Sequence, residues 1–250
     1  MKIYRTSQAA SLADIHPNTV RLYEELGYLP PVPRAANGYR IYHQLHIEHL
    51  LLIRSAFRST WLGGAIRQQA LQVITQAAAG DITKALASAR KHLALITSER
   101  EKAELAAEYL ETWADIEHNG PETMSCRKVG DAVKHLDITH DMLRSWERNG
   151  LILIPRNSQN GYREIGEEQI RRLYLIRALR KARFSLMSIY HMLQYYDRGG
   201  RDRLTGILNE LAPDEEDIFF NTDQWLTKIN SIETSAREVM NRLYSIEKLL

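Results

Sequence analysis

One motif occurs twice in this 250-residue chain, and that duplication constrains the fold more than any other feature. The motif starts with an arginine and a glutamate three residues apart, continues with a glycine, and ends with Asn-Gly-Tyr-Arg. Every matched pair is separated by 123 positions, which indicates that nothing is inserted or deleted between the two motifs. Two copies at so long a spacing predict a duplicated domain and not a solenoid, whose units have tens of residues. The copies are Arg21–Glu24, Gly27 and Asn37–Arg40, and then Arg144–Glu147, Gly150 and Asn160–Arg163.

Composition is that of an ordinary soluble protein. With 44% hydrophobic and 26% charged residues, the chain has enough apolar material for two modest cores. No stretch approaches the roughly 18 uninterrupted apolar residues of a membrane span, and the N-terminus lacks the apolar core of a signal peptide. Cys126 is the single cysteine, which excludes an internal disulfide and a cysteine-rich metal site. These observations favour a cytoplasmic protein without a membrane partner.

The net charge of +2 conceals two basic and two acidic blocks. Residues 1–80 and 121–200, which hold the two motifs, carry net charges of +4 and +5. The segments that follow them, 81–120 and 201–250, carry −3 and −4. Random scatter of charge in a near-neutral chain is the alternative reading. We interpret the segregation as a sign that the repeats face a polyanion.

Each repeat predicts helices, a turn and a hairpin in the same order. In the first, residues 7–13 form a short helix, and a second helix over 19–26 is capped by Asn18 and ended by Gly27. A proline-rich stretch then leads to a hairpin that pairs 28–29 with 39–42 around the Asn-Gly turn, which needs a positive φ. Helices over 129–136, 141–148, 167–182 and 186–195 and a hairpin at Asn160-Gly161 are expected in the second repeat. A helix-turn-helix followed by a hairpin is a winged helix-turn-helix.

Apolar residues follow each repeat with heptad spacing. The first seam runs from Ile82 to Leu110 with Arg100 as its one polar position, and the second runs from Trp225 to Leu250. Such spacing predicts long coiled-coil helices, although burial against a domain's own surface would give the same stripe. We therefore expect a mainly α-helical chain with a first winged helix domain, a coiled-coil helix, a second winged helix domain, and a connector with a C-terminal coiled-coil helix. These segments span 1–80, 81–118, 126–200 and 201–250.

The first repeat carries residue types that read DNA. An α-helix fits the major groove and places its first side chains against base edges. An arginine there can pair with guanine or a phosphate, and an asparagine can pair with adenine. Alternatively, the tyrosines pack between the hairpin and the helix, and the arginines are solvated charges on the surface. The expected contacts are His16, Asn18, Thr19, Arg21 and Tyr23 on the second helix and Arg34, Tyr39 and Arg40 on the hairpin.

These motifs resemble the DNA-binding domain of the mercury-resistance-regulator (MerR) family. The resemblance rests on Thr19–Glu24, Gly27–Pro31, Arg34 and Asn37–Tyr42, and it extends to the second repeat more loosely through Leu143–Glu147 and Asn160–Arg163. Membership implies a transcription regulator that binds and distorts a promoter with RNA polymerase as a partner. It also implies a long helix that pairs antiparallel with its partner helix. The contacts expected in the second repeat are Arg144, Trp146, Arg156, Tyr162 and Arg163.

The second repeat departs from the first at the start of the reading helix. Asp141, Met142 and Trp146 replace Asn18, Thr19 and Tyr23. A carboxylate at this position can accept from a cytosine amino group, repel a phosphate, or simply cap the helix. We therefore expect the two repeats to read different sequences.

Other residue types do not form a recognisable site. Metal sensing of the family's kind uses cysteines after the long helix, which this chain lacks. His43, His46 and His49 stand three apart on one predicted helix, where rotation separates the outer two and favours a structural role. The aromatic residues Tyr190, Tyr195, Tyr196, Phe219 and Phe220 are expected in a core. Without a phosphate loop, nucleophile elbow or metal triad, we expect no enzyme, no metal and no cofactor.

The short link between the repeats, 118–125, spans at most ~28 Å when extended. That length suits an intramolecular pseudo-dimer in which helix 82–117 pairs with helix 225–250, and a homodimer with four DNA-binding heads is the alternative. We therefore expect a DNA-binding transcription regulator that reads an asymmetric operator in duplex DNA. The alternatives are an architectural or recombination accessory protein, and an interaction or ligand-binding module with a degenerate second repeat.

Overall fold

A computed structural model describes residues 2–119, 127–209 and 224–250, which are mainly helical. The chain divides into two compact units, each built around one repeat. Unit 1 comprises residues 1–98 and 229–250, and unit 2 comprises residues 99–228. No helix in the described part of the chain is both long and apolar enough to span a membrane.

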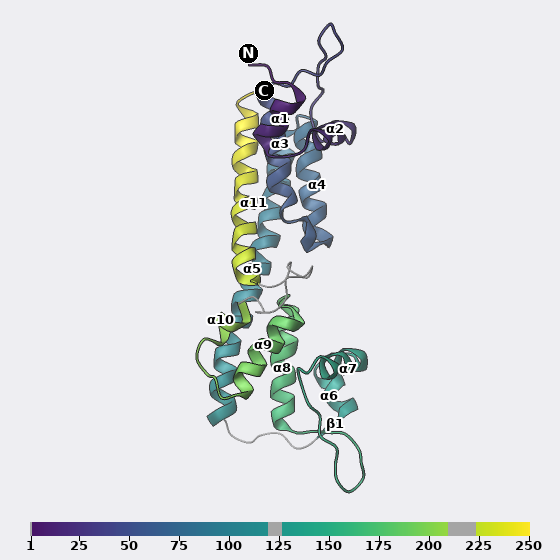
Figure 1. Cartoon of the computed structure of the whole chain (residues 1–250), viewed down its shortest axis with the longest axis vertical. Coiled ribbons are helices and arrows are strands. Elements are labelled where there is room, and N and C mark those ends of the chain that lie inside the picture. The colour runs from purple at the N-terminus through teal and green to yellow at the C-terminus, as the bar shows by residue number, and fades with distance from the viewer. Residues whose placement is uncertain (1, 120–126, 210–223) are drawn as a thin grey trace. The chain divides into compact units, whose positions relative to one another are not determined.

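Unit 1 contains the first repeat and parts of two long helices (Figure 1). The helix-turn-helix consists of α1 and α2, and α3 and α4 follow after the hairpin loop, with a short 3-10 helix η1 between them. The long helix α5 continues beyond unit 1, and α11 returns to it from the end of the chain. The bounds are α1 Thr6–Ala13, α2 Pro17–Glu25, α3 Gln44–Phe57, η1 Thr60–Leu62, α4 Gly64–Ala78, α5 Ile82–Asn119 and α11 Trp225–Glu247.

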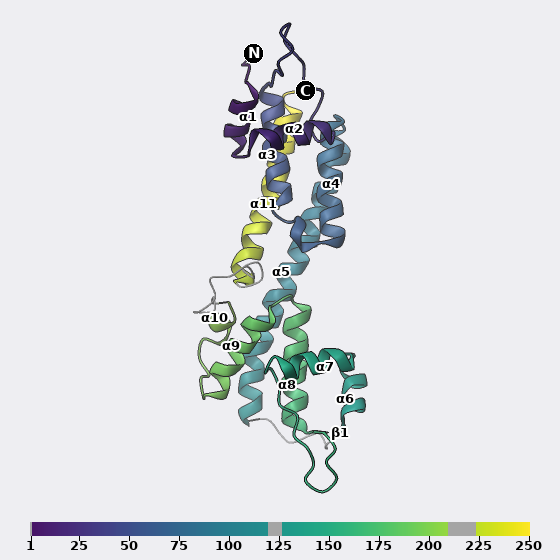
Figure 2. The ribbon, with the colours of Figure 1, turned by 45° about the vertical axis from the view of Figure 1, so that its right-hand side comes forward.

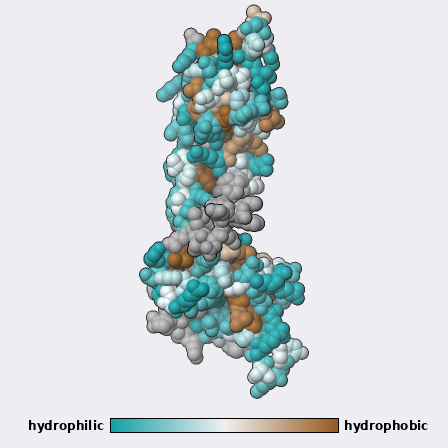
Figure 3. Space-filling model, in the orientation of Figure 1, coloured by the Kyte–Doolittle hydropathy of each residue, from teal (hydrophilic) through white to brown (hydrophobic). Residues whose placement is uncertain are grey.

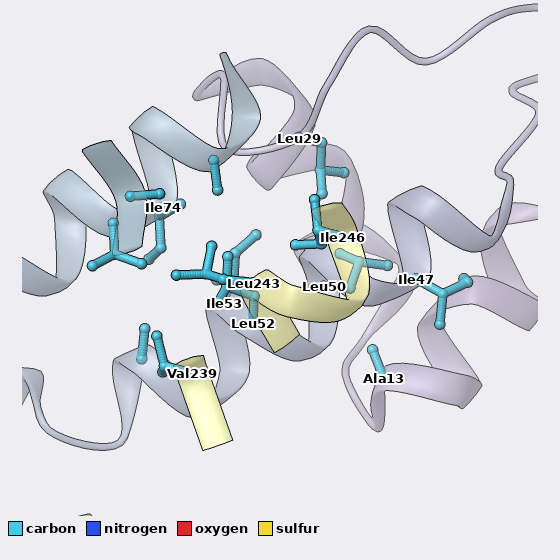
Figure 4. Close-up of a cluster of buried hydrophobic side chains, with 14 of the residues drawn as sticks. Ala13, Leu29, Ile47, Leu50, Leu52, Ile53, Ile74, Val239, Leu243 and Ile246 are labelled. Atoms are coloured by element: carbon cyan, nitrogen blue, oxygen red, sulfur yellow. The ribbon is translucent and has the colours of Figure 1, made fainter. Parts of the chain in front are cut away.

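The core of unit 1 joins residues from both ends of the chain (Figure 4). Val239, Leu243 and Ile246 of α11 belong to the same buried cluster as Leu50 and Ile53 of α3. Burying a leucine or isoleucine side chain contributes about 1.5–3 kcal/mol, so α11 is part of this core. The prediction of long helices after each repeat is confirmed. Most of their seam residues are buried inside the units, and the pairing of these helices as an extended coiled coil stays a prediction.

The seam prediction fails at the last residue. Leu250 is 69% exposed because α11 ends at Glu247, three residues earlier. The preceding seam residues Trp225, Ile229, Ile232, Ala236, Val239, Leu243 and Ile246 are all buried.

The first hairpin loop is held by isolated bridges rather than by regular strands. Tyr4 bridges Tyr42, and Arg34 bridges Arg40. The turn closes where the Gly38 N–H donates to the carbonyl of Ala35, and Gly38 has the expected positive φ of 80°. The predicted pairing of 28–29 with 39–42 is wrong, because the Ile41 N–H donates to the carbonyl of Pro33 instead. A proline keeps its carbonyl acceptor although it lacks an N–H.

Unit 2 contains the second repeat, the remainder of α5 and the first turn of α11. Its two strands pair antiparallel, with Arg127 opposite Ile165. This pairing lies 123 positions after the Tyr4–Tyr42 bridge of unit 1. The remaining elements are β1 Arg127–Lys128, α6 Val129–His135, α7 His140–Arg148, β2 Glu164–Ile165, α8 Glu167–Lys181, α9 Leu186–Asp197 and α10 Leu204–Asn209.

The two hairpin loops differ in length, which corrects the reading of the constant 123-residue offset. In unit 2, Arg156 bridges Arg163, and the Glu164 N–H donates to the carbonyl of Pro155. The acceptor prolines, Pro33 and Pro155, are therefore 122 positions apart, whereas the donors Ile41 and Glu164 are 123 positions apart. Compared with the first repeat, the second repeat has one residue fewer between the glycine and the proline and one residue more between the proline and the end of the turn. The Asn157 side chain accepts from the Gln159 and Asn160 N–H groups and orders the longer turn.

The caps of α2 and α7 also differ from expectation. His16, not Asn18, is the N-cap of α2, and its Nδ1 accepts from the Asn18 N–H at 3.1 Å. In α7 the Thr139 hydroxyl is the cap and accepts from the Met142 N–H at 3.0 Å. Asp141 therefore does not cap its helix. The side chains of Asn18 and Asp141 both lie exposed on the first helical turn.

Several expectations lie outside the described residues. These are residues 120–125 of the predicted link, and Phe219 and Phe220 of the aromatic group. The other members of that group belong to α9, where Tyr196 packs on Trp113 of α5 with ring centroids 4.7 Å apart. The Tyr195 hydroxyl donates to Asp202 at 2.6 Å.

Candidate nucleic-acid interface

The first turn of α2 presents Asn18 and Arg21 to solvent. Both residues are exposed, and Nη1 of Arg21 donates to Oδ1 of Asn18 at 2.9 Å. Thr19 between them is half-buried. This hydrogen bond orients the guanidinium without neutralising its charge. The turn therefore offers one amide and one cation to a partner.

A groove of about 800 Å³ lies between this turn and the hairpin loop. Arg5, Arg21 and Arg40 bring three guanidinium groups to its wall. In Figures 1 and 2, the loop projects away from the helices of unit 1, and the second loop projects in the same manner from unit 2. Hydrophobic residues form separate patches on the face drawn in Figure 3. The groove is lined by Ile3, Tyr4, Arg5, Thr6, Ser7, Pro17, Arg21, Ala35, Asn37, Tyr39, Arg40 and Ile41.

Arg40 connects the hairpin loop to α2. Its Nε lies 2.6 Å from the carboxylate of Glu24, and the Tyr42 hydroxyl approaches the same carboxylate at 3.4 Å. The hydrogen bond that Arg40 donates to the Glu24 carboxylate raises the pKa of the Arg40 guanidinium. Arg34 lies 4.0 Å from Glu24 and donates to the carbonyl of Gly38 at 3.3 Å. One carboxylate on α2 thus holds both arms of the loop.

Tyr39 at the tip of the loop is 74% exposed, and so is its counterpart Tyr162. Packing between hairpin and helix, the alternative role for Tyr39, is therefore not what the structure has. Tyr23 does pack: its ring lies 6.1 Å from that of Tyr28 and 5.8 Å from that of Phe57. Burial, with a smaller effect from Tyr28, raises the pKa of its phenol. The loop tyrosines are free for contact, whereas Tyr23 is half-buried.

Unit 2 repeats these contacts with different chemistry on α7. Arg163 pairs with Glu147, and Arg156 donates to the carbonyl of Gly161 at 3.1 Å. Arg144 lies 3.5 Å from the carboxylate of Asp141, in the place of the neutral contact between Arg21 and Asn18. Because this pair is exposed, the interaction is weak and a phosphate can compete for the arginine. The cation is nevertheless partly neutralised.

Trp146 is not available to a partner. Its side chain is 3% exposed, so its indole lies in the core of unit 2 and not on the reading surface. Trp146 stands at the position that Tyr23 has in unit 1, and its side chain is buried whereas that of Tyr23 is half-buried. Of the sequence-predicted residues, the structure exposes His16, Asn18, Arg21, Arg34, Tyr39, Arg144, Arg156 and Tyr162 and leaves Thr19, Tyr23, Arg40 and Arg163 partly buried.

Sequence reasoning missed Arg5, Glu24 and Glu147. The two glutamates stand 16 positions before their arginines in both repeats. That shared spacing of opposite charges was a signal for the ion pair. Arg5 carried no such signal, because it reaches the groove only through the pairing of Tyr4 with Tyr42.

His43 is the N-cap of α3, and His46 and His49 lie on the helix. The His43 N–H donates to Nδ1 of His46, and Nε2 of His46 lies 3.3 Å from the carbonyl of Pro31. His49 is buried, and desolvation lowers its pKa to about 4. Among the described residues, no three histidine, cysteine or carboxylate side chains gather in a metal-binding arrangement.

Two family models match the chain at the two repeats. Residues 5–42 match the MerR family regulatory protein model, and residues 127–196 match the MerR HTH family regulatory protein model. The chain carries two MerR-family domains. The resemblance of both repeats to the MerR family is thereby confirmed.

Curated relatives match over shorter lengths. The chain is 47% identical over 47 residues to the HTH-type transcriptional regulator CueR of Vibrio cholerae, covering 19% of this chain and 34% of that protein. It is 40% identical over 50 residues to CueR of Escherichia coli O157:H7, covering 20% and 37%. A probable heavy metal-dependent transcriptional regulator of Haemophilus influenzae is 34% identical over 73 residues, covering 29% and 57%. The chain thus spans about a third to a little over half of the length of these MerR-type relatives. No solved structure matches the chain.

Proposed function

We propose that the chain is a transcription regulator that binds duplex DNA through both MerR-family domains. The observation that carries this proposal is the repeated constellation of an exposed arginine on the reading helix and an exposed tyrosine at the tip of a charge-anchored loop. The helix suits the major groove, and the loop suits the sugar-phosphate backbone. In this proposal the protein binds DNA without catalysing a reaction and acts in the cytoplasm.

The two domains read unlike half-sites. Asn18 offers an amide that pairs with adenine, whereas Asp141 is a pure acceptor suited to a cytosine amino group. The longer second loop also reaches the backbone differently. An asymmetric operator follows from these differences. By family resemblance, the regulator distorts a promoter and acts on RNA polymerase there.

The exchange of long helices supports an intramolecular pseudo-dimer. In unit 1, α11 from the end of the chain contacts the first repeat, where Ser55 donates to Glu238 at 3.1 Å. In unit 2, the second half of α5 contacts the second repeat through Glu99 with Arg183 and Trp113 with Tyr196. Each repeat therefore packs against the helix that follows the other repeat. A monomer of 28.9 kDa in solution supports this proposal, and twice that mass supports a homodimer.

The reading arginines provide a matched test. Arg21→Ala and Arg144→Ala remove one cation from each domain, so each lowers affinity for the operator. Each also reduces the slope of log affinity against log salt by about 1. Arg90→Ala, which removes an exposed charge on α5, is the control and leaves binding unchanged. No effect of Arg21→Ala on binding would refute reading by the first domain, and no effect of Arg144→Ala would refute reading by the second.

A second candidate is a chain whose second domain no longer reads DNA. The ion pair of Arg144 with Asp141 and the burial of Trp146 favour this candidate. It predicts that Arg21→Ala weakens binding while Arg144→Ala does not. The architectural role is distinguished by the absence of a preferred sequence.

A further inference from the structure

The duplication allows one helix contact to be compared between the units. In unit 1, three hydrogen bonds join α3 and its C-cap Arg58 to α11. Arg58 donates to Ser235 at 3.3 Å, Ser55 donates to Glu238 at 3.1 Å, and Arg242 donates to Glu48 at 3.1 Å. The Glu238 carboxylate is central, and its bonds to Arg242 and Ser55 lower its pKa despite partial burial. This helix contact is filled and its charges are paired.

The same positions of unit 2 have different side chains. Ala178 and Lys181 on α8 stand 123 positions after Ser55 and Arg58. Opposite them, α5 presents Lys102, Leu105 and Tyr109, which have the same i, i+3 and i+7 spacing as Ser235, Glu238 and Arg242 on α11. In this alignment, Leu105 of unit 2 corresponds to Glu238 of unit 1.

A trough of about 530 Å³ opens between α5 and α8 at this place. Ala106, Ala178 and Ala182 line it, and their small side chains leave the space open. Leu105 stands beside them and is 64% exposed, so its apolar side chain is open to water at the trough. Tyr109 lines the same trough, and burial raises the pKa of its phenol.

The rim of the trough is positively charged. Nζ of Lys102 lies 2.9 Å from Glu99, and Arg183 pairs with the same carboxylate. Lys181 is exposed and forms no ion pair within the described part of the chain. Two cations therefore share the Glu99 carboxylate and Lys181 adds a third positive charge without a carboxylate of its own among the described residues, whereas Glu238 supplies the anion at the corresponding contact of unit 1.

We propose that this trough binds a small amphiphilic carboxylate, aliphatic or aromatic. Its carboxylate pairs with Lys102 and Lys181 and supplies the charge that unit 1 provides internally. Its apolar part packs on the alanines that line the trough and removes the exposed Leu105 from water. Unit 2 is then a ligand-binding unit as well as a MerR-family domain.

Calorimetric titration of the full-length chain with decanoate, below its micelle concentration, tests this proposal. Saturable binding at one site is expected, with decanol bound at least tenfold more weakly because it lacks the charge. Lys181→Ala weakens decanoate binding roughly tenfold. Ala178→Leu fills the trough and abolishes binding. Lys91→Ala removes another exposed lysine of α5 and is the matched control, which leaves binding unchanged.

Two outcomes overturn the proposal. One is the absence of decanoate binding, or binding that Lys181→Ala and Ala178→Leu leave intact. The other is a wild-type chain of twice 28.9 kDa that Leu105→Glu converts to a monomer, which means that a second copy covers the trough. Because Lys181 is exposed, its substitution tests the site even if Ala178→Leu disturbs the helix contact. Binding of decanoate is measured without DNA, so its failure is distinct from failure of DNA binding.

Discussion

The guanidinium of Arg40 lies 2.6 Å from the carboxylate of Glu24, and this ion pair joins the hairpin loop to the reading helix α2. Arg163 and Glu147 form the same pair in the second unit. The side chains of Arg40 and Glu24 are only 23% and 20% exposed, so water screens the pair less than at an open surface. An arginine of the expected DNA surface therefore has a positioning role inside its own domain.

Replacing Glu24 with alanine should detach the loop. The substitution leaves Arg40 without its partner, and the free energy of unfolding should fall by about 1–2 kcal/mol. DNA affinity should fall as well, although a negative charge has been removed from the basic surface. Urea unfolding and a DNA-binding titration measure the two effects. Glu25→Ala, at an exposed neighbouring carboxylate, is the control. Tighter DNA binding by Glu24→Ala would show that the ion pair has no positioning role.

The loop tyrosines should matter for binding and not for stability. Tyr39 and Tyr162 are each 74% exposed, so Tyr39→Ala and Tyr162→Ala should change the free energy of unfolding by less than about 0.5 kcal/mol. Both variants should weaken DNA binding at every sequence to a similar extent, because contacts to the backbone carry no sequence information. Titration with specific and nonspecific duplexes measures this. Unchanged affinity in both variants would remove the loop tips from the interface.

His49 should make the stability of unit 1 depend on pH. Burial lowers its pKa to about 4, whereas an imidazole in the unfolded chain titrates near ~6.5. The unfolded state therefore binds the proton first, so stability is complete above pH ~6.5 and decreases as the pH falls towards 4. The loss approaches ~3 kcal/mol. His46 and His92, whose pKa values burial also lowers, add to it.

Urea unfolding between pH 7 and pH 4 measures this dependence. The variant His49→Leu should show a flatter profile than the wild type, because it has no imidazole to protonate at that position. An equally steep profile in the variant would assign the pH dependence to other groups.

Leu243 should contribute strongly to the stability of unit 1. It is fully buried on α11 in the core cluster with residues of α3, so Leu243→Ala should cost about 2–5 kcal/mol. Leu250→Ala is the matched control on the same segment, and at 69% exposure it should cost less than about 0.5 kcal/mol. Urea unfolding compares the two. Equal, small effects would mean that α11 is not part of the core of unit 1.

The sequence was sufficient for the parts of the fold that local patterns specify. The 123-residue repeat, the heptad seams and the positive φ of Gly38 were all predictable, because periodicity and turn chemistry act over short stretches. The N-cap of α2 was not predictable from the sequence. His16 and Asn18 both have side chains that can accept a hydrogen bond from the N–H groups of the first helical turn. The predicted partner strand of residues 39–42 was also wrong. The proline-rich stretch was interpreted as an interruption of the hairpin, although the carbonyl of Pro33 still accepts a hydrogen bond from Ile41.

The candidate site was less predictable than the fold. The arginines were found from their residue type, but whether each one faces solvent or a carboxylate depends on the packing of loop against helix. Trp146 illustrates this limit, because its indole N–H suggested a contact and its ring size dictated burial. The placement of α11 in unit 1 and of the second part of α5 in unit 2 also depends on contacts between distant residues, which no local pattern specifies.

Selection of bound sequences from a random duplex DNA library tests the central claim most directly. Two different half-sites at a fixed separation are expected, with Asn18→Asp changing only one of them and Asp141→Asn only the other. A palindrome, or a single half-site unaffected by Asp141→Asn, would contradict two reading domains. The absence of any enriched sequence would contradict sequence-specific regulation.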